Sequence, residues 1–403
     1  MSAPWLSIIG LGEDGLAGLS PAATHLLRQA RLVVGGARHL ALAGNLAAET
    51  LAWPSPMDGA FSAILARRGQ PVCVLASGDP FFFGVGSTLL RHVDAREMIC
   101  LPGPSAFSLA AARLGWAQQD CALISLHGRP LERIIPRLHA SARVLALSWD
   151  GSTPGKLAGL LRARGLGRSC ITVCENLGGP RERVRPSLAS EFALTEIDPL
   201  NTIAIEVVSD PGARVISCAP GLPDDWFEHD GQITKREIRA VTLSALAPRR
   251  GELLWDIGAG SGSVAIEWML ADPANRAIAI ERDEARGARL MRNAASLGTP
   301  DVRLEQGAAP EALCDLPTPD AIFIGGGATR PGVLDAALAA LRPGGRLVVN
   351  AVTLETQAEL SRRFATLGGD LIQLQVSHAE AIGGFHGFRP AMPVVQWSHD
   401  KPW

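Results

Sequence analysis

Short apolar runs alternate with amphipathic stretches along the whole 403-residue chain. In the first half, the apolar runs predict strands at Leu6–Ile9, Leu32–Val34, Val72–Leu75, Ile171–Cys174 and Thr202–Val208. A helical pattern covers residues 21–30, where Ser20 stands at the N-cap and Pro21 at the first helical position. Because strands and helices alternate, this half is expected to form an α/β layer structure.

The alternation is interrupted once, near the middle of the chain. Residues 209–212 and 219–225 combine Pro and Gly with acidic residues, which is typical of turns and linkers. We therefore expect an N-terminal domain over residues 1–209, a linker over 210–231 and a C-terminal domain over 232–403.

The second half is expected to form a doubly wound parallel sheet. Thr234 and Glu237 have the spacing of a capping box and predict the start of a helix, and a second helix is expected from about Ser263. Apolar runs predict strands at Leu253–Asp256, Ala277–Ile280, Ala321–Ile324 and Arg346–Val349. In such sheets ligands bind at the carboxyl ends of the strands.

Composition and charge exclude several classes of protein. The net charge of −2 indicates no surface for polyanions, so we expect no nucleic-acid partner. No apolar stretch reaches the roughly 18 residues of a membrane span, so we expect no membrane partner. The seven Cys form no Cys-x-x-Cys pair, which argues against zinc and disulfides, and we expect no metal site. The start of the chain has no signal-peptide pattern, which predicts a cytoplasmic protein.

The strongest motif lies between the first strand and the next helix of the second half. Its acid and glycines resemble motif I of class I S-adenosylmethionine methyltransferases, and Glu281 stands where that family places the acid that holds the ribose hydroxyls. A carboxylate can accept both hydroxyl hydrogen bonds. The resemblance implies these cofactor-binding residues: Asp256, Gly258, Ala259, Gly260, Ser261, Gly262 and Glu281. An NAD site remains the alternative, although the glycine spacing differs from Gly-x-Gly-x-x-Gly.

Two further segments follow in the second half. Residues 306–310 stand where the class I family places its adenine-contacting loop. Residues 320–327 end in three glycines, with no Asn-Pro-Pro-Tyr sequence, which disfavours methylation of a base amino group. Because small residues leave room for a bulky substrate, Gly325, Gly326 and Gly327 are expected to line the substrate site, although a plain turn would also explain them.

Four segments of the first half together resemble the tetrapyrrole methylases: residues 10–15, 77–84, 101–106 and 173–178. That resemblance implies a class III methyltransferase fold of two αβα subdomains. It implies cofactor contacts, mainly through the backbone, at Gly78, Asp79, Pro80, Ser105 and Ala106, and a substrate-facing loop at Gly10 and Gly12. The chain departs from the family pattern at Glu13, which replaces Pro, and at Ala106, which replaces Ser.

Several other residues have two readings. The aromatic residues Phe81–Phe83 fit either a core or a tetrapyrrole contact, and His127 fits either a cleft or a core position. Arginines at 181–185, Arg330 and Arg389 suit either substrate carboxylates or a solvated surface. No residue stands out as a catalytic acid or base.

The two halves in this order resemble the decarboxylating precorrin C5,15-methyltransferases, over roughly residues 5–395. The most specific marks are residues 231–239, 256–262, 323–327 and 350–355. In that family, positions matching Thr234 and Ala309 touch the cofactor, whereas Ala308 replaces the usual Asp.

The resemblance implies two S-adenosyl-L-methionine sites per chain, a precorrin (tetrapyrrole) substrate and a homo-oligomer. The N-terminal half would methylate precorrin-6B at C-5. The C-terminal half would methylate C-15 and remove the carboxylate of the C-12 acetate, giving precorrin-8x in cobalamin biosynthesis. The alternatives are a cobalt-containing substrate, a different substrate such as RNA, an NAD-linked oxidoreductase and a non-catalytic scaffold.

Overall fold

The computed structural model describes residues 4–54, 56 and 58–403. The first three residues, on which the expectation about a signal peptide partly rests, lie outside the described residues. The chain forms two compact units: unit 1 ends at Arg214, and unit 2 comprises Val215–Trp403 together with Glu132–Pro136. The boundary falls inside the segment for which a linker was expected. None of the described helices is long and apolar enough to cross a membrane.

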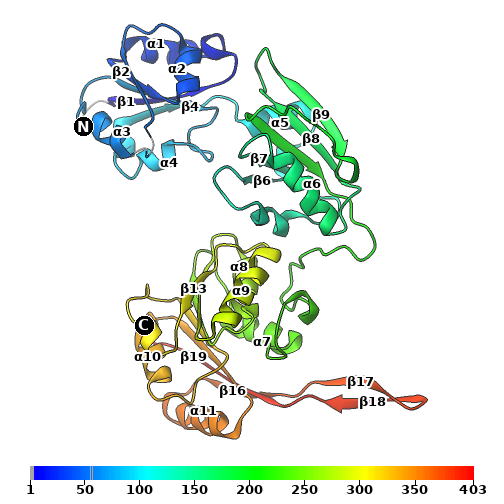
Figure 1. Ribbon diagram of the computed structural model, residues 1–403. Helices are drawn as coiled ribbons and strands as arrows, with labels where there is room; N and C mark the ends of the chain where they lie inside the picture. Colours follow the sequence, from blue (N-terminus) through cyan, green and yellow to red (C-terminus); the bar gives the residue numbers. More distant parts are fainter. Residues whose placement is uncertain (1–3, 55, 57) are drawn as a thin grey trace. The chain divides into compact units, whose positions relative to one another are not determined.

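The first sheet of unit 1 is entirely parallel, in the order β3-β2-β4-β1-β5 (Figure 1). Its strands are β1 (Leu6–Leu11), β2 (Leu32–Gly35), β3 (Glu49–Ala52), β4 (Val72–Ser77) and β5 (Met98–Leu101). Side chains alternate between its faces. Ile9 and Leu11 pack with α1 (Pro21–Gln29) and α2 (Ala37–Ala43), whereas Leu6 and Ile8 pack with α3 (Asp58–Leu65) and α4 (Gly86–Leu89). This is an αβα subdomain.

The second sheet of unit 1 is mixed, in the order β6-β7-β10-β8-β9. Its strands are β6 (Cys121–Ser125), β7 (Arg143–Leu147), β8 (Cys170–Glu175), β9 (Arg183–Leu188) and β10 (Asn201–Glu206). Only β6 and β7 pair in parallel. The buried Phe107 of α5 (Ala106–Leu114) packs on Leu145 and Ala204, and α6 (Thr153–Ala163) buries Leu157 and Leu161.

Unit 2 contains a seven-stranded sheet in the order β13-β12-β11-β14-β15-β19-β16. The strands are β11 (Leu253–Ile257), β12 (Arg276–Glu281), β13 (Arg303–Gln306), β14 (Ala321–Ile324), β15 (Arg346–Ala351), β16 (Asp370–Leu374) and β19 (Val394–Asp400). The helices are α7 (Arg236–Leu246), α8 (Ser263–Ala271), α9 (Glu284–Ser296), α10 (Val333–Ala340) and α11 (Leu354–Leu367). Strand β19 pairs antiparallel with both neighbours, so the sheet is mixed rather than wholly parallel.

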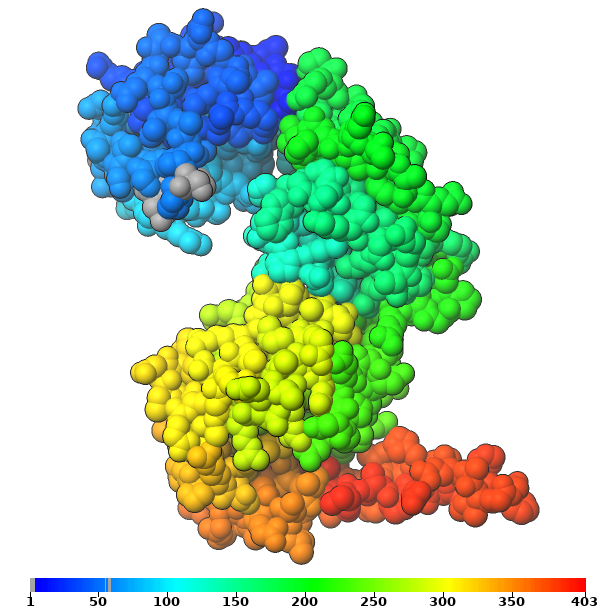
Figure 2. Space-filling model, viewed as in Figure 1, coloured from blue at the N-terminus to red at the C-terminus, as the bar shows by residue number. Residues whose placement is uncertain are grey.

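Two features of unit 2 differ from the sequence expectations. The capping box at Thr234 is wrong: α7 begins at Arg236, Lys235 is its N-cap, and no side chain caps it. The carbonyl of Thr234 instead accepts a hydrogen bond from Arg239 Nη1 at 2.5 Å. The hairpin of β17 (Ser377–Ile382) and β18 (Phe385–Pro390) was not expected, and it extends away from the body of unit 2 (red in Figure 2).

Candidate active sites

A pocket of about 1190 Å³ lies at the carboxyl ends of the central strands of unit 2. It brings together most of the residues that the sequence singled out in the second half: Thr234, Asp256, Gly258, Ala259, Gly260, Ser261, Glu281, Ala309, Gly325, Gly326 and Gly327. Gly262 does not line it. A Cβ at that position would lie 2.5 Å from Leu290 Cγ, so this glycine allows α8 and α9 to approach each other.

The loop after β11 needs glycine for its backbone shape. Gly258, Gly260 and Gly262 have φ angles of 71°, 57° and 77°, which side chains other than glycine rarely tolerate. A Cβ on Gly258 would lie 2.9 Å from the carbonyl oxygen of Gly326, so the loops after β11 and β14 touch through their backbones. The pocket floor is therefore built largely of main chain.

Two buried carboxyl groups face this loop. Glu281 accepts hydrogen bonds from the backbone N–H groups of Gly260 at 2.8 Å and Asp283 at 2.9 Å. Asp256 accepts one from Ala265 N at 3.0 Å, and its Oδ1 is buried with no hydrogen-bond partner among the described residues. Burial, reinforced by the nearby charge of Glu281, raises the pKa of Asp256 to about 7.

The far end of the pocket is open. A Cβ on Gly326 would meet no described atom within 4 Å. Asn350, at the end of β15, also lines the pocket, and its side chain is held by Gln396 and Thr242 through hydrogen bonds of 2.9 Å. This end combines free space with one fixed amide.

Sequence reasoning missed a buried ion pair that contacts the segment before α7, part of which lines this pocket. Glu267 on α8 accepts hydrogen bonds from Arg239 Nε at 2.6 Å and from the N–H groups of Gly221 and Leu222. Arg239 is fully buried and also donates to the carbonyls of Leu222 and Thr234. These hydrogen bonds attach residues 221–234 to α7 and α8 within unit 2. Arg239 lies in the segment 231–239 that the family resemblance had marked.

In unit 1, three glycine loops meet at the carboxyl edge of the parallel sheet. A Cβ on Gly10 would lie 1.8 Å from Gly78 O and 2.3 Å from Gly103 N. Gly103 N in turn donates to Gly78 O at 2.9 Å. Gly12 is close to its own loop, where a Cβ would lie 2.6 Å from Asp14 Oδ1. The loops that the sequence analysis selected are therefore in backbone contact.

The remaining residues selected in unit 1 lie beside this junction. Asp79 accepts a hydrogen bond from Phe81 N at 2.9 Å, and the carbonyl of Pro80 accepts one from Gly86 N at 2.8 Å. Ser105 caps α5 by accepting from Ser108 N at 3.1 Å, and Ala106 is the first residue of that helix. A Cβ on Gly78 would lie 2.9 Å from Ser105 Cα, which links the two segments.

The residues for which two interpretations were open differ in their exposure. Phe81 and Phe83 are exposed, whereas Phe82 is partly buried against Phe107. His127 is exposed, so a core position is wrong for it.

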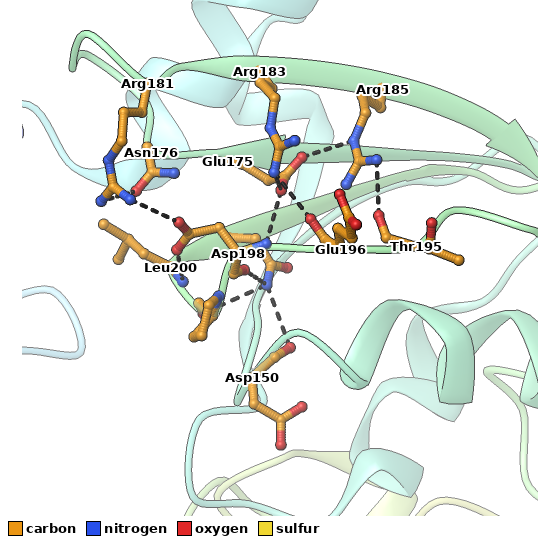
Figure 3. A network of polar contacts seen from close by, with 12 residues as sticks. Asp150, Glu175, Asn176, Arg181, Arg183, Arg185, Thr195, Glu196, Asp198 and Leu200 are labelled. Atoms are coloured by element: carbon orange, nitrogen blue, oxygen red, sulfur yellow. Dashed lines mark hydrogen bonds and ion pairs between the residues drawn. The ribbon is translucent and has the colours of Figure 1, made fainter.

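The arginines at 181–185 belong to a polar network around Glu175, which has no exposed surface (Figure 3). Glu175 accepts from Arg183 Nη2 at 2.6 Å, Arg185 Nε at 2.8 Å and the backbone N–H of Asp198 at 2.8 Å. Arg181 Nη1 lies 3.3 Å from Asp198 Oδ2. The network ties the loop before β10 to β8 and β9. These cations are therefore in contact with acids, and Arg183 and Arg185 share the single charge of Glu175. Arg330, paired with Glu311, and Arg389, paired with Glu380, are also in contact with acids.

Comparison with known proteins matches both halves. The family model of tetrapyrrole (corrin/porphyrin) methylases matches residues 6–193, and the model of the precorrin methyltransferase domain matches residues 225–401.

Three curated relatives cover different shares of the chain. A decarboxylating precorrin-6Y C(5,15)-methyltransferase of Sinorhizobium sp is 56% identical over 99% of this chain and 97% of its own length. A cobalt-precorrin-7 C(5)-methyltransferase of Salmonella typhimurium is 34% identical over 44% of this chain and 88% of its own length. A protein of Pyrobaculum calidifontis, named for cobalt-precorrin-6B C(15)-methyltransferase (decarboxylating) activity, is 36% identical over 43% of this chain and 93% of its own length.

Proposed function

Because this chain belongs to the family of decarboxylating precorrin-6Y C5,15-methyltransferases, we propose that it methylates a precorrin at C-5 and C-15 and removes the carboxylate of the C-12 acetate. The observation that carries this proposal is the 56% identity to such an enzyme over nearly the whole of both chains. The reaction would convert precorrin-6B into precorrin-8x in cobalamin biosynthesis.

The two methylations are assigned to different units. Relatives named for C-5 methylation and for C-15 methylation with decarboxylation each match less than half of this chain, so the two activities can occur in separate proteins. The tetrapyrrole methylase match over residues 6–193 supports C-5 methylation in unit 1. C-15 methylation and decarboxylation then belong to unit 2.

The unit 2 pocket fits S-adenosyl-L-methionine. Glu281 keeps acceptor capacity for ribose hydroxyls, since each oxygen receives only one described hydrogen bond. The unpartnered Oδ1 of Asp256 is an acceptor for a polar group of the ligand. The glycine loop lets the ligand approach the backbone, with Thr234 and Ala309 in the walls. When bound, this cofactor supplies a methyl group activated by a sulfonium.

The substrate carries several carboxylates, and free arginines are the natural partners for them. The arginines that the sequence suggested are occupied by acids. Arg236 and Arg282, in contrast, line the pocket, are exposed, and have no ion-pair or hydrogen-bond partner among the described residues. We assign substrate carboxylates to these two residues.

Decarboxylation needs an electron sink, and a conjugated imine of the macrocycle can serve. The open end of the pocket beside Gly326 accepts the ring in one orientation for both C-15 methylation and loss of carbon dioxide. Unit 2 then acts mainly by positioning.

The direct test is product analysis with the full chain, metal-free precorrin-6B and methyl-labelled cofactor. Two added methyl groups and one lost carbon dioxide per substrate are expected by mass spectrometry. If only the cobalt-containing analogue is turned over, that analogue and not metal-free precorrin-6B is the substrate. Protection of the protein by NAD instead of S-adenosylhomocysteine would overturn the proposal.

The number of cofactor sites and the assembly state need their own measurements. We propose two S-adenosyl-L-methionine sites per chain, so calorimetry with S-adenosylhomocysteine is expected to fit about two. A single site would contradict this. We also expect a homo-oligomer, which light scattering of the full chain tests.

A further inference from the structure

A compact polar cluster lies at the carboxyl edge of the parallel sheet in unit 1, next to the glycine junction. Glu13 follows β1, Arg38 and His39 lie on α2, and Ser77 ends β4. Ser77 Oγ lies 2.8 Å from Arg38 Nη2 and 2.9 Å from His39 Nε2, and Arg38 Nη2 lies 3.0 Å from His39 Nε2. Arg38 Nη1 forms an ion pair with Glu13. Ligands of such sheets bind at this edge.

The contacts determine the tautomer of His39. A guanidinium only donates hydrogen bonds, so Nε2 of His39 carries its single lone pair rather than a proton, and Arg38 and Ser77 share that lone pair. The ring proton is therefore on Nδ1, which is buried without a partner among the described residues. Ser77, which has both a donor and acceptor lone pairs, can accept from Arg38 and donate to Nε2 at the same time.

The imidazole is also held in its neutral form. Burial, together with the neighbouring charge of Arg38, lowers the pKa of His39 to about 4. Glu13, whose side chain is 11% exposed, compensates that charge. Glu13 is also the residue that replaces the usual Pro of the tetrapyrrole methylase pattern. The replacing residue is therefore the one that forms the ion pair with Arg38. Ser77 is the exposed member of the group and directly precedes Gly78.

We propose that Ser77 and His39 form the proton-accepting pair for methylation in unit 1. This inference rests on the proposed function, because it names the residues that complete C-5 methylation. Replacing hydrogen by methyl on a carbon requires a proton to leave, and a positioned base accelerates that step.

The step balances as follows. The enamine carbon C-5 uses its π electron pair to bond the methyl carbon, and the electrons of the carbon–sulfur bond remain on sulfur. The ring system is then an iminium that still carries the original hydrogen on C-5. Ser77 Oγ accepts this proton while its own hydroxyl proton passes to the lone pair of His39 Nε2, and the C–H electrons restore the conjugation. Arg38 Nη2 then gives up its hydrogen bond to Nε2 and keeps the one to Ser77 Oγ. A cationic iminium is a strong carbon acid, so a weak neutral base suffices.

The test uses His39→Gln and Ser77→Ala in the full chain, with His25→Gln on the exposed face of α1 as the matched control. Because a general base contributes about 10²–10⁴-fold, His39→Gln is expected to slow C-5 methylation at least about 100-fold. C-15 methylation and carbon dioxide release in the same chain are expected to be unchanged. Binding of S-adenosylhomocysteine at both sites, measured by calorimetry, is also expected to be unchanged.

A substrate deuterated at C-5 separates a chemical role from a structural one. If proton removal has become limiting, both variants show an isotope effect on C-5 methylation that is larger than in the unaltered chain. An unaltered C-5 rate in His39→Gln overturns the proposal, as does slowing without a larger isotope effect. If His39→Gln unfolds, the rate and the isotope effect of Ser77→Ala test the proposal instead, because that variant removes only an exposed hydroxyl group. Failure of the unaltered chain to methylate C-5 refutes the proposed function itself, and this inference with it.

Discussion

Gly10 of unit 1 and Gly326 of unit 2 have opposite surroundings. In unit 1, Gly10 is required by contact, since a Cβ would lie 1.8 Å from the carbonyl oxygen of Gly78. In unit 2, Gly326 borders open space, since a Cβ would meet no described atom within 4 Å. Gly10 is near the carboxyl end of β1, and Gly326 follows the carboxyl end of β14, so both lie at the carboxyl edge of a sheet.

The difference separates two ways of building the edge of a sheet at which we propose that the cofactor binds. Unit 1 joins its loops through their backbones, and polar side chains such as Ser77 and His39 lie beside the junction. Unit 2 leaves a pocket of about 1190 Å³ and places buried carboxyl groups in its wall. A substitution at the backbone junction of unit 1 is expected to disturb the structure, whereas a substitution beside the open pocket of unit 2 is expected to block ligands.

Gly10→Ala is expected to have the largest effect. The backbone must shift because the new methyl group would overlap Gly78 O and Gly103 N. Overpacking of this kind costs about 1–3 kcal/mol, so denaturant unfolding of unit 1 should move to lower concentration. C-5 methylation should be lost while C-15 methylation continues.

The matched control is Gly155→Ala on α6, where the nearest atom would lie 3.9 Å away. Alanine favours helix, so this variant is expected to be as stable as the unaltered protein or slightly more stable. Equal stability of Gly10→Ala and Gly155→Ala would contradict the contact that we describe.

Gly326→Leu is expected to stop C-15 methylation and decarboxylation together. The side chain would enter the open end of the pocket, and misplacing a substrate by about 1 Å can cost 10²-fold in rate. The protein should remain folded and should still bind S-adenosylhomocysteine measurably in unit 2. Gly384→Leu, at the tip of the hairpin and also free of neighbours within 4 Å, is the control. Normal decarboxylation by Gly326→Leu would place that step elsewhere.

Glu281→Gln is expected to weaken one of the two cofactor sites. A hydrogen bond to a charged acceptor contributes about 1.5–3 kcal/mol, which corresponds to roughly 10- to 150-fold in affinity. Calorimetry should show one weakened and one unchanged site. Glu284→Gln, exposed at the start of α9, should leave both unchanged. Two unchanged sites in Glu281→Gln would remove this residue from cofactor binding.

Asp256→Asn is expected to change the pH dependence of stability and not the chemistry of either unit. The pKa of this carboxyl is about 7 in the folded protein and near its usual 3.8 when unfolded. Folding therefore takes up a proton between these values, and stability should decrease as pH rises from about 4 to about 7.

An asparagine stays neutral, so the variant should lose less stability than the unaltered protein between pH 5 and pH 8. Denaturant midpoints at the two pH values measure this. The exposed Asp370→Asn should keep the slope of the unaltered protein. Identical slopes in all three proteins would mean that Asp256 ionises normally.

Many of the strands and the glycine loops that follow them could be predicted from the sequence. Short continuous apolar runs indicated β1, β2, β4, β8 and β10 in unit 1 and β11, β12, β14 and β15 in unit 2, because strands that are covered on both faces are apolar at successive positions. The edge strands β3 and β9 were missed, since their residues are largely exposed and lack that pattern.

Local chemistry predicted the glycine loops and the acid at Glu281, because tight turns need glycine and the acid follows a strand directly. The partners of the charged residues depend on tertiary structure. Whether Arg183 is free or compensated depends on Glu175 and on a loop that returns many residues later. Arg239 and Glu267 are 28 positions apart, and Arg38 and Ser77 are 39 apart.

The features that could be read from the sequence are therefore those that depend on neighbouring residues: many strands, some helix starts, the glycine turns and the division into two parts. Only the folded chain shows that a Cβ on Gly10 would overlap its neighbours whereas one on Gly326 would enter open space, which arginines contact acids, and that His39 Nε2 lies 2.9 Å from Ser77 Oγ. The physical reason is that backbone geometry follows from neighbouring residues. Desolvation, charge compensation and hydrogen-bond direction follow instead from whichever distant groups the fold brings within a few ångströms.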